Sequence, residues 1–185
     1  MPRPAEPGRN ALLNAGEQVA QDRGLRGLSI NAVVEVAGMA KGSFYHHFPD
    51  RRSYVIALHR RYHDALAELI TARIGDIAPG VERIRAGITA YLDACLETRG
   101  TKAFLAQSRT DTDLLDEVSA RNRDFAGVVE GDLAGLGWPD PGAVAQLMVA
   151  MVAEIALVEL YDNGPRADLR AAVMDLIDRE GERGR

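Results

Sequence analysis

Apolar side chains recur every three or four residues along most of the chain, and no segment shows the alternation of two that favours a β-strand. The pattern therefore predicts an all-α fold. Helix starts are expected where residues that cap helices precede the apolar runs. In the first third these starts follow Asn10, Ser29 and Asp50, and a further short helix is expected around Phe44 and Phe48.

Two glycines divide the first third into short helices. Gly24 is expected to end the first helix and Gly38 the second, because glycine adopts the left-handed conformation of a helix C-terminus at low cost. Only residues 38–40 separate the second helix from the stretch KGSFYHHF at 41–48. Two short helices joined by such a turn have helix-turn-helix spacing, in which the second helix can enter the major groove of DNA.

The rest of the chain is predicted to be helical, with firm breaks at residues 75–80 and 137–142. Ala143–Tyr161 is apolar nearly all round, so we expect it to be buried on several sides. It also contains Glu154 and Glu159, and a carboxylate at the centre of a bilayer costs about 2.5–3.5 kcal/mol. A buried helix is therefore favoured over a membrane span.

The net charge of the chain is −5, and the charged residues are distributed unevenly along it. Residues 1–63 carry nine Lys or Arg against five Asp or Glu, whereas residues 64–185 carry 13 against 22. A basic first third suits an anionic partner such as DNA, although an uneven solvated surface would give the same pattern.

The single cysteine, Cys95, excludes an intrachain disulfide and favours a reducing cytoplasm. Its position on an apolar stripe favours a small buried hydrophobe over a redox-sensing thiol. The first nine residues hold three prolines and no apolar run, so we expect a flexible arm and not a secretory signal.

The stretch LSINAVVEVAGMAKGSFYHHFPDRRSYVIAL, residues 28–58, resembles the signature of the tetracycline-repressor (TetR) family of bacterial transcriptional regulators. The resemblance is strong over residues 10 to about 65 and extends beyond them only in layout. It implies a helix-turn-helix domain followed by a helical ligand-binding domain whose last two long helices form a dimer interface. In this chain that interface is expected to comprise Ala143–Tyr161 and Leu169–Ile177.

With the breaks described above, this resemblance gives the expected domain organisation. A flexible arm at 1–9 precedes a helix-turn-helix DNA-binding domain at 10–65, which includes the start of the connecting helix. An effector-binding and dimerisation domain follows at 66–180, with a frayed tail at 181–185.

Positions within the motif imply the DNA contacts. The groove-facing residues are Lys41, Gly42, Ser43, Tyr45, His46 and His47, and the phosphate-binding residues are Ser29, Asn31 and Arg51. Lysine can donate to guanine, hydroxyl groups can donate to bases or phosphates, and glycine permits close approach. Ala40 departs from the family pattern, which places a capping residue there. Losing a cap costs about 0.5–2 kcal/mol, so we expect this helix start to be frayed without DNA.

An effector pocket is expected in the second domain, because cavities between helices combine apolar walls with a few polar anchors. Its candidate lining is Tyr91, Cys95, Phe104, Gln107, Phe125, Trp138, Met148, Met151 and Glu154. The aromatic and Met residues also suit ordinary core positions. Glu154, on an apolar helix, needs a partner, either an arginine across the dimer or a polar group of the ligand.

His59 and His63 have the spacing of a metal pair on a helix, but Arg60 and Arg61 between them oppose a cation, and the general-base Glu of zinc peptidases is absent. Structural or solvent-facing roles are favoured for both histidines. A small helical metal-binding protein or enzyme using them is one alternative function, and an effector-independent DNA-binding regulator is another.

The resulting expectation is a cytoplasmic homodimeric repressor with no catalytic residue, cofactor or metal. It would bind a palindromic operator in double-stranded DNA and be released by a small, lipophilic effector.

Overall fold

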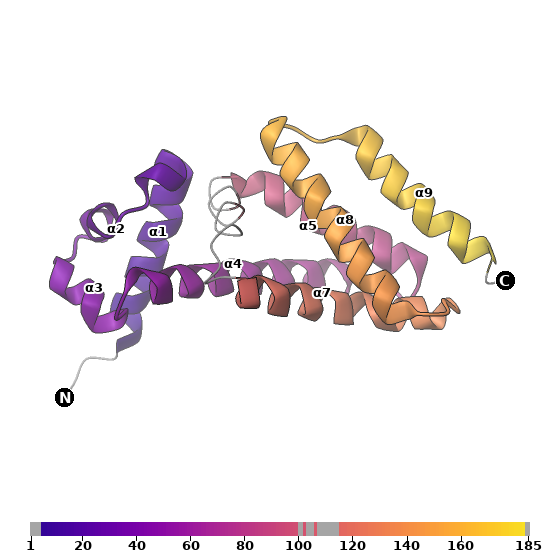
Figure 1. Cartoon of the computed structure of the whole chain (residues 1–185), viewed down its shortest axis with the longest axis horizontal. Helices are drawn as coiled ribbons and strands as arrows, with labels where there is room; N and C mark the ends of the chain where they lie inside the picture. The colour runs from indigo at the N-terminus through magenta and orange to yellow at the C-terminus, as the bar shows by residue number, and fades with distance from the viewer. Residues whose placement is uncertain (1–4, 100–101, 103–105, 107–114, 184–185) are drawn as a thin grey trace. The chain divides into compact units, whose positions relative to one another are not determined.

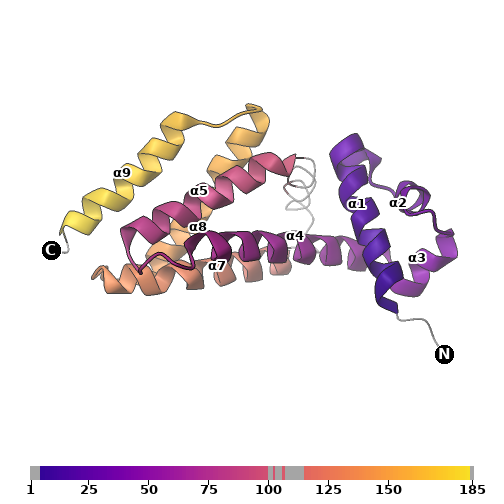
Figure 2. The same ribbon diagram turned by 180° about the vertical axis from the view of Figure 1, so that it is seen from behind.

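The computed structural model describes residues 5–99, 102, 106 and 115–183. Over these ranges the chain forms helices joined by short turns, with no strand, which confirms the predicted all-α class (Figures 1 and 2). The helices are α1 (Ala5–Gly27), α2 (Ile30–Val36), α3 (Lys41–His47), α4 (Arg51–Ile74), α5 (Val81–Glu97), α7 (Leu115–Gly135), α8 (Pro141–Tyr161) and α9 (Ala167–Arg183). The chain divides into two compact units: the first contains residues 5–63 and the described part of 98–115, and the second contains residues 64–97 and 116–183.

An aromatic cluster of Phe44, Phe48 and Tyr54 forms part of the core of the first unit. Phe44 and Phe48 lie on one face of α3 and are buried, as their four-residue spacing predicts. Their ring centroids lie 5.1 and 5.0 Å from that of Tyr54, near the beginning of α4. The cluster therefore attaches α3 to α4 through buried apolar contacts.

Tyr54 also fixes α4 against α1. Its hydroxyl donates a 2.8 Å hydrogen bond to the carbonyl oxygen of Leu12. A Cβ at Gly16, one turn further along α1, would lie 1.9 Å from the Tyr54 hydroxyl oxygen, so the close approach requires glycine. Burial, and to a lesser degree the charge of Glu17, raises the pKa of Tyr54 and keeps the hydroxyl protonated.

The helix α1 is longer at both ends than the sequence predicts. Its predicted start after Asn10 is wrong, because Ala5–Arg9 already belong to the helix and a proline in the first turn needs no N–H partner. Its predicted end at Gly24 is also wrong, because the helix continues to Gly27. A glycine costs a helix about 1 kcal/mol without preventing it. The expected arm at 1–9 is therefore helical from residue 5 onwards.

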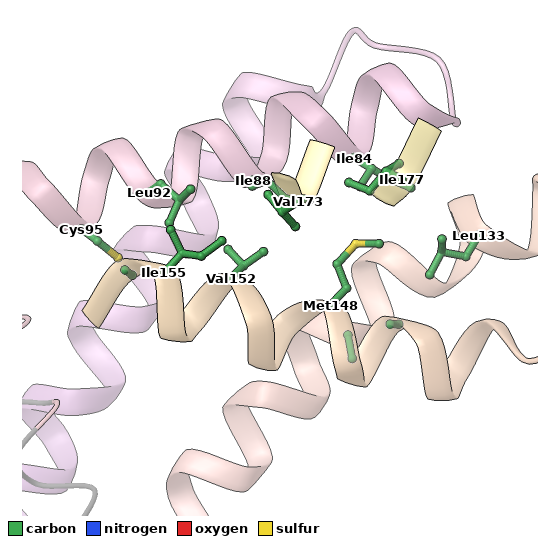
Figure 3. Close-up of a cluster of buried hydrophobic side chains, with 13 residues drawn as sticks. Ile84, Ile88, Leu92, Cys95, Leu133, Met148, Val152, Ile155, Val173 and Ile177 are labelled. Atoms are coloured by element: carbon green, nitrogen blue, oxygen red, sulfur yellow. The ribbon is translucent and has the colours of Figure 1, made fainter. Parts of the chain in front are cut away.

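In the second unit the core lies between α5, α7, α8 and α9. Figure 3 shows Cys95 and Leu92 of α5 close to Ile155 of α8, and Ile84 of α5 close to Ile177 of α9. The buried cluster consists of Ile84, Ile88, Leu92, Cys95, Ala126, Leu133, Ala145, Met148, Val152, Ile155, Ala156, Val173 and Ile177.

The break before α8 is shorter than the predicted 137–142. Gly137, at φ 79°, ends α7 with the left-handed conformation, and the N–H of Trp138 donates to the carbonyl of Leu133 at 3.2 Å. Asp140 then caps α8 by accepting a 3.0 Å hydrogen bond from the N–H of Ala143. Pro141 is the first residue of α8, a position where its fixed φ is favourable.

Of the two glutamates in α8, Glu159 is the one with a partner inside the protein. Glu159 is fully buried, and both its oxygens accept hydrogen bonds from Arg170 of α9, at 2.6 and 2.8 Å. The backbone N–H of Arg166 donates a third at 2.9 Å. Arg170 also donates to Asp93 of α5 at 2.6 Å, so this network joins α5, α8 and α9. Glu154 is exposed, which places it outside the core.

A second buried carboxylate, Asp132 of α7, holds the beginning of α5. It accepts two hydrogen bonds from Arg83, at 2.8 and 2.5 Å, and one from the N–H of Gly80 at 3.1 Å. This bidentate hydrogen bonding raises the pKa of Arg83. The pair fixes the α4–α5 connection to α7.

The expected burial of α8 on several sides is wrong for the isolated chain. Leu147, Met151 and Tyr161 are 65%, 41% and 73% exposed, and they lie on one face with Glu154. By length and composition α8 could cross a membrane. Its opposite face, however, packs in the core and carries the ion-paired Glu159. In the single chain this leaves one apolar face uncovered.

Candidate nucleic-acid interface

The helices α2 and α3 form the predicted helix-turn-helix. Ser29 caps α2, as expected, by accepting a 3.1 Å hydrogen bond from the N–H of Ala32. Gly38 has a φ of 62°, which glycine adopts without strain, and the N–H of Met39 donates to the carbonyl of Val34 at 2.9 Å. Ala40 occupies the N-cap of α3 and makes no side-chain hydrogen bond there. The turn is thus closed on the α2 side and uncapped on the α3 side.

Burial separates the two faces of α3. Phe44 is fully buried, whereas Lys41, Tyr45 and His46 are exposed and Ser43 is half-buried. The side chains that the motif assigns to the DNA groove are therefore available at the surface of the first unit, with the partial exception of His47.

Gly42 lies among these exposed residues, and a Cβ built on it would meet no atom of the described residues within 4 Å. No internal contact of the described residues therefore requires glycine at this position. The open space permits close approach of a ligand to the backbone, which is the role the motif implies.

His47 is half-buried and packs against α1. A Cβ at Gly8 would lie 2.5 Å from its Nε2 atom, so the ring occupies the space beside this glycine. The ring of His46 lies 5.2 Å away, edge to face, and is exposed. The two neighbouring histidines thus have different surroundings: one contacts α1 and the other faces solvent.

The expected phosphate-binding residues lie at the beginnings of α2 and α4. Asn31 and Arg51 are exposed, and Ser29 is exposed while it caps α2. Asp50 caps α4 by accepting a 2.7 Å hydrogen bond from the N–H of Ser53, and this hydrogen bond lowers the pKa of Asp50. A cap at this point fixes the first turn of α4, which carries Arg51.

Lys41 and Arg51 have no hydrogen-bonding or ion-pairing partner among the described residues, so their charges are available to a ligand. Arg61, by contrast, is held by Glu17 at 3.3 Å and by the side chain of Asn14. Like Lys41 and Arg51, Arg9 of α1 has no hydrogen-bonding or ion-pairing partner among the described residues. Its guanidinium carbon lies 5.2 Å from the centre of the Phe48 ring. Arg9 was missed because it falls within the expected arm and contacts a residue distant in sequence.

The effector candidates are only partly gathered in the second unit. The rings of Tyr91 and Phe125 lie 6.1 Å apart, edge to face, and Tyr91 and Trp138 pack against the core that contains Cys95 and Met148. The two candidates Phe104 and Gln107 lie outside the described residues. The remaining two, Met151 and Glu154, are exposed on the outer face of α8 and do not join this group.

His59 and His63 lie with ring centroids 4.4 Å apart on α4. His59 is buried and His63 is half-buried. No cluster of three or more His, Cys, Asp or Glu side chains suited to a metal occurs in the part of the chain that the structure describes. A zinc site needs at least three protein ligands, so the pair alone does not form one.

Comparison with known proteins agrees with this geometry. The family described as bacterial regulatory proteins, tetR family, matches residues 12–58, which include α2, α3 and the beginning of α4. An uncharacterised helix-turn-helix transcriptional regulator of Mycobacterium tuberculosis is 22% identical over 166 residues, covering 90% of this chain and 81% of the relative. The transcriptional repressor NemR of Escherichia coli is 35% identical over 72 residues, covering 37% of this chain and 36% of NemR.

Solved structures show the same fold over nearly the whole chain. A transcriptional regulator from Rhodococcus sp. Rha1 superposes with a TM-score of 0.77 at 23% identity, covering 94% of this chain and 96% of that one. The helix-turn-helix geometry and the family match together show that the DNA-binding part of this chain, residues 12–58, belongs to the tetR family of bacterial regulatory proteins.

Proposed function

We propose that the protein is a homodimeric repressor that binds a palindromic operator and is released by a small, lipophilic effector. The observation that carries the proposal is the exposed side of α3 and the start of α4, where Lys41 and Arg51 have no partner among the described residues. Unpaired cations beside a helix that can enter the major groove provide both phosphate attraction and base contacts. The chain is a regulator and not an enzyme.

The proposed dimer interface is the outer face of α8 with the adjoining part of α9. Leu147, Met151 and Tyr161 of α8 are exposed, and so is Leu176 of α9, at 53%. Large apolar groups gathered on one face favour burial against a second copy, and a two-fold dimer buries the same face twice. Two recognition helices must lie about 34–36 Å apart to enter successive major grooves.

The proposed effector site lies in the second unit near Tyr91, Phe125 and Trp138, which are half-buried. Their apolar rings favour a lipophilic ligand. The Nε1–H of Trp138 is buried and has no acceptor among the described residues, so it could anchor one polar atom of such a ligand. The net negative charge of residues 64–185 disfavours a strongly anionic effector.

Release would follow from differential affinity. The effector would bind more tightly to a conformation in which the two recognition helices are not at the separation that fits the operator, and so would shift the dimer towards that conformation. The factor by which the effector lowers operator affinity equals the factor by which the operator lowers effector affinity. Repression is proposed here by analogy with NemR, a repressor that is 35% identical to this chain over 72 residues.

The first test is selection of bound sequences from random duplex DNA at about 0.15 M salt, which screens nonspecific attraction. An inverted repeat supports a dimeric operator-binding protein, whereas a single half-site, or no enrichment, contradicts it. Binding of the selected operator is then measured against salt for Lys41→Ala and Arg51→Ala. Each lost phosphate contact should lower the slope of log K against log[salt] by about 0.9.

A matched control is Arg23→Ala, because Arg23 is exposed on α1 but lies far along the helix from α3. Its slope should equal that of the unmodified protein. A metabolite screen against operator binding then tests release. Affinity that no compound alters would support an effector-independent regulator instead, and copurified metal lost in His63→Ala would support the metal-binding alternative.

A further inference from the structure

The first turn of α1 contacts the end of the recognition helix α3 and the residue that follows it. The guanidinium carbon of Arg9 lies 5.2 Å from the centre of the Phe48 ring, within the range of a cation–π contact. Phe48 is buried in the aromatic cluster, so its ring is a fixed support. Arg9 itself is exposed.

A second contact joins the same two segments. The ring of His47 lies so close to Gly8 that a Cβ there would be 2.5 Å from His47 Nε2. The ring therefore lies against the bare backbone of α1 and is half-buried, whereas His46 is exposed. The neighbouring residues Gly8 and Arg9 thus contact the neighbouring residues His47 and Phe48.

A cation–π contact with a ring does not use up the five N–H donors of a guanidinium, so they stay available to an acceptor. Arg9 has no hydrogen-bonding or ion-pairing partner among the described residues to occupy them. An arginine held in place beside a DNA-reading helix suits bidentate binding of a phosphate, since its orientation is fixed before the ligand arrives.

We propose that the first turn of α1 is part of the DNA-binding surface: Arg9, held over Phe48, binds a backbone phosphate, and Gly8 seats His47 so that the end of α3 is correctly positioned. The proposal rests on the assignment of α3 as the recognition helix. In it His47 is a positioning residue and does not read bases.

Arg9 is tested with Arg9→Gln, which keeps a polar side chain of similar reach without the charge. Loss of one phosphate contact should lower the salt slope by about 0.9, which corresponds to about fivefold weaker operator binding at 0.15 M salt. The ranking of operator variants should not change, because phosphate contacts carry no base information. Arg23→Gln, about 21 Å further along α1, is the matched control and should retain the full slope.

Gly8 is tested with Gly8→Ala. Unlike Arg9→Gln, this variant should change the sequence specificity and leave the salt slope unchanged. Displacing His47 should reduce discrimination between the operator and random DNA while the salt slope stays the same. Adding His47→Ala removes the obstructing ring, so Gly8→Ala should then have no further effect. Circular dichroism and thermal midpoints establish that each variant is folded.

An unchanged slope in Arg9→Gln overturns the phosphate contact, and additive effects of Gly8→Ala and His47→Ala overturn the seating. The same experiments distinguish failure of this inference from failure of the proposed function. If Lys41→Ala and Arg51→Ala weaken operator binding while Arg9→Gln and Gly8→Ala do not, only this inference fails. If none of the four has an effect, the recognition surface itself is misassigned.

Discussion

Replacing Arg170 by Met should strongly destabilise the second unit, because it leaves the Glu159 carboxylate buried without its counter-charge. Glu159 is fully buried and accepts three hydrogen bonds, two of them from Arg170. Only the bond from the backbone of Arg166 would persist. Breaking a buried ion pair by removing one partner costs about 3–5 kcal/mol. The free energy of unfolding of a protein is about 5–15 kcal/mol in total, and a chain of 185 residues loses about 2–4 °C of thermal midpoint per kcal/mol, so the midpoint should fall by about 6–20 °C.

Unfolding of this unit can be followed through Trp138, the single tryptophan of the chain, which packs against the core of the second unit. Urea and thermal transitions of Trp138 fluorescence give the midpoints directly. Arg166→Met is the matched control, since the side chain of Arg166 pairs with the exposed Asp162 and Asp168. Its effect should be a small fraction of that of Arg170→Met.

The pH dependence gives a second signature. Burial raises the pKa of Glu159, but the hydrogen bonds from Arg170 and from the N–H of Arg166 outweigh it and leave the pKa lowered. In the unmodified protein this contribution to stability is therefore present above the ordinary carboxyl pKa and is lost as pH falls through the lower folded value. In Arg170→Met burial is uncompensated and the pKa rises, so the penalty should be largest at pH 8 and smaller at pH 5.

Replacing both partners by apolar residues should restore much of the loss. In Glu159→Met with Arg170→Met, no charge remains to be buried, and such replacements are often neutral or stabilising. The reasoning would be refuted by an Arg170→Met midpoint equal to that of Arg166→Met. A penalty that does not change between pH 8 and pH 5 would refute it equally.

Three further predictions concern other local features. Gly16→Ala should destabilise the first unit by about 1–3 kcal/mol, because its Cβ would overlap the Tyr54 hydroxyl, and adding Tyr54→Phe should recover part of this in chemical unfolding. Ser29→Ala should cost about 0.5–2 kcal/mol through loss of the α2 cap, measurable as faster hydrogen exchange in α2; unchanged exchange would contradict the capping role. Hydrogen bonding to Arg166 lowers the pKa of Asp168 to about 2, so its contribution to stability should be present above about pH 4 and vanish as pH falls towards 2. Asp168→Asn should remove that dependence from the thermal midpoint, and an unaltered acid profile would argue against the pairing.

The helix-turn-helix could be predicted because its determinants are local. The cap at Ser29, the left-handed glycine at Gly38 and the spacing of Phe44 and Phe48 each act within one or two turns. The contact of Arg9 with Phe48 joins positions far apart in sequence, and no local pattern indicates it.

The two carboxylates of α8 show a second kind of feature that the sequence pattern could not predict. Glu154 and Glu159 are five residues apart and therefore point to different sides of the helix. Because the helix is apolar nearly all round, its hydrophobic pattern does not identify which side faces the core. The partner of Glu159 comes from the next helix, and its position depends on the turn between them. For the same reason, the pattern could not separate Met151, on the outer face, from Met148 in the core.

The burial of Lys102 has a practical consequence for chemical labelling. The chain contains two lysines, and the structure places Lys102 4% exposed while Lys41 is exposed at the start of α3. An amine-reactive reagent should therefore modify a single lysine side chain of the folded protein. Its rate of acylation, followed by mass spectrometry of the proteolytic peptide that contains Lys41, becomes a direct readout of occupancy of the recognition helix in mixtures where binding cannot otherwise be observed.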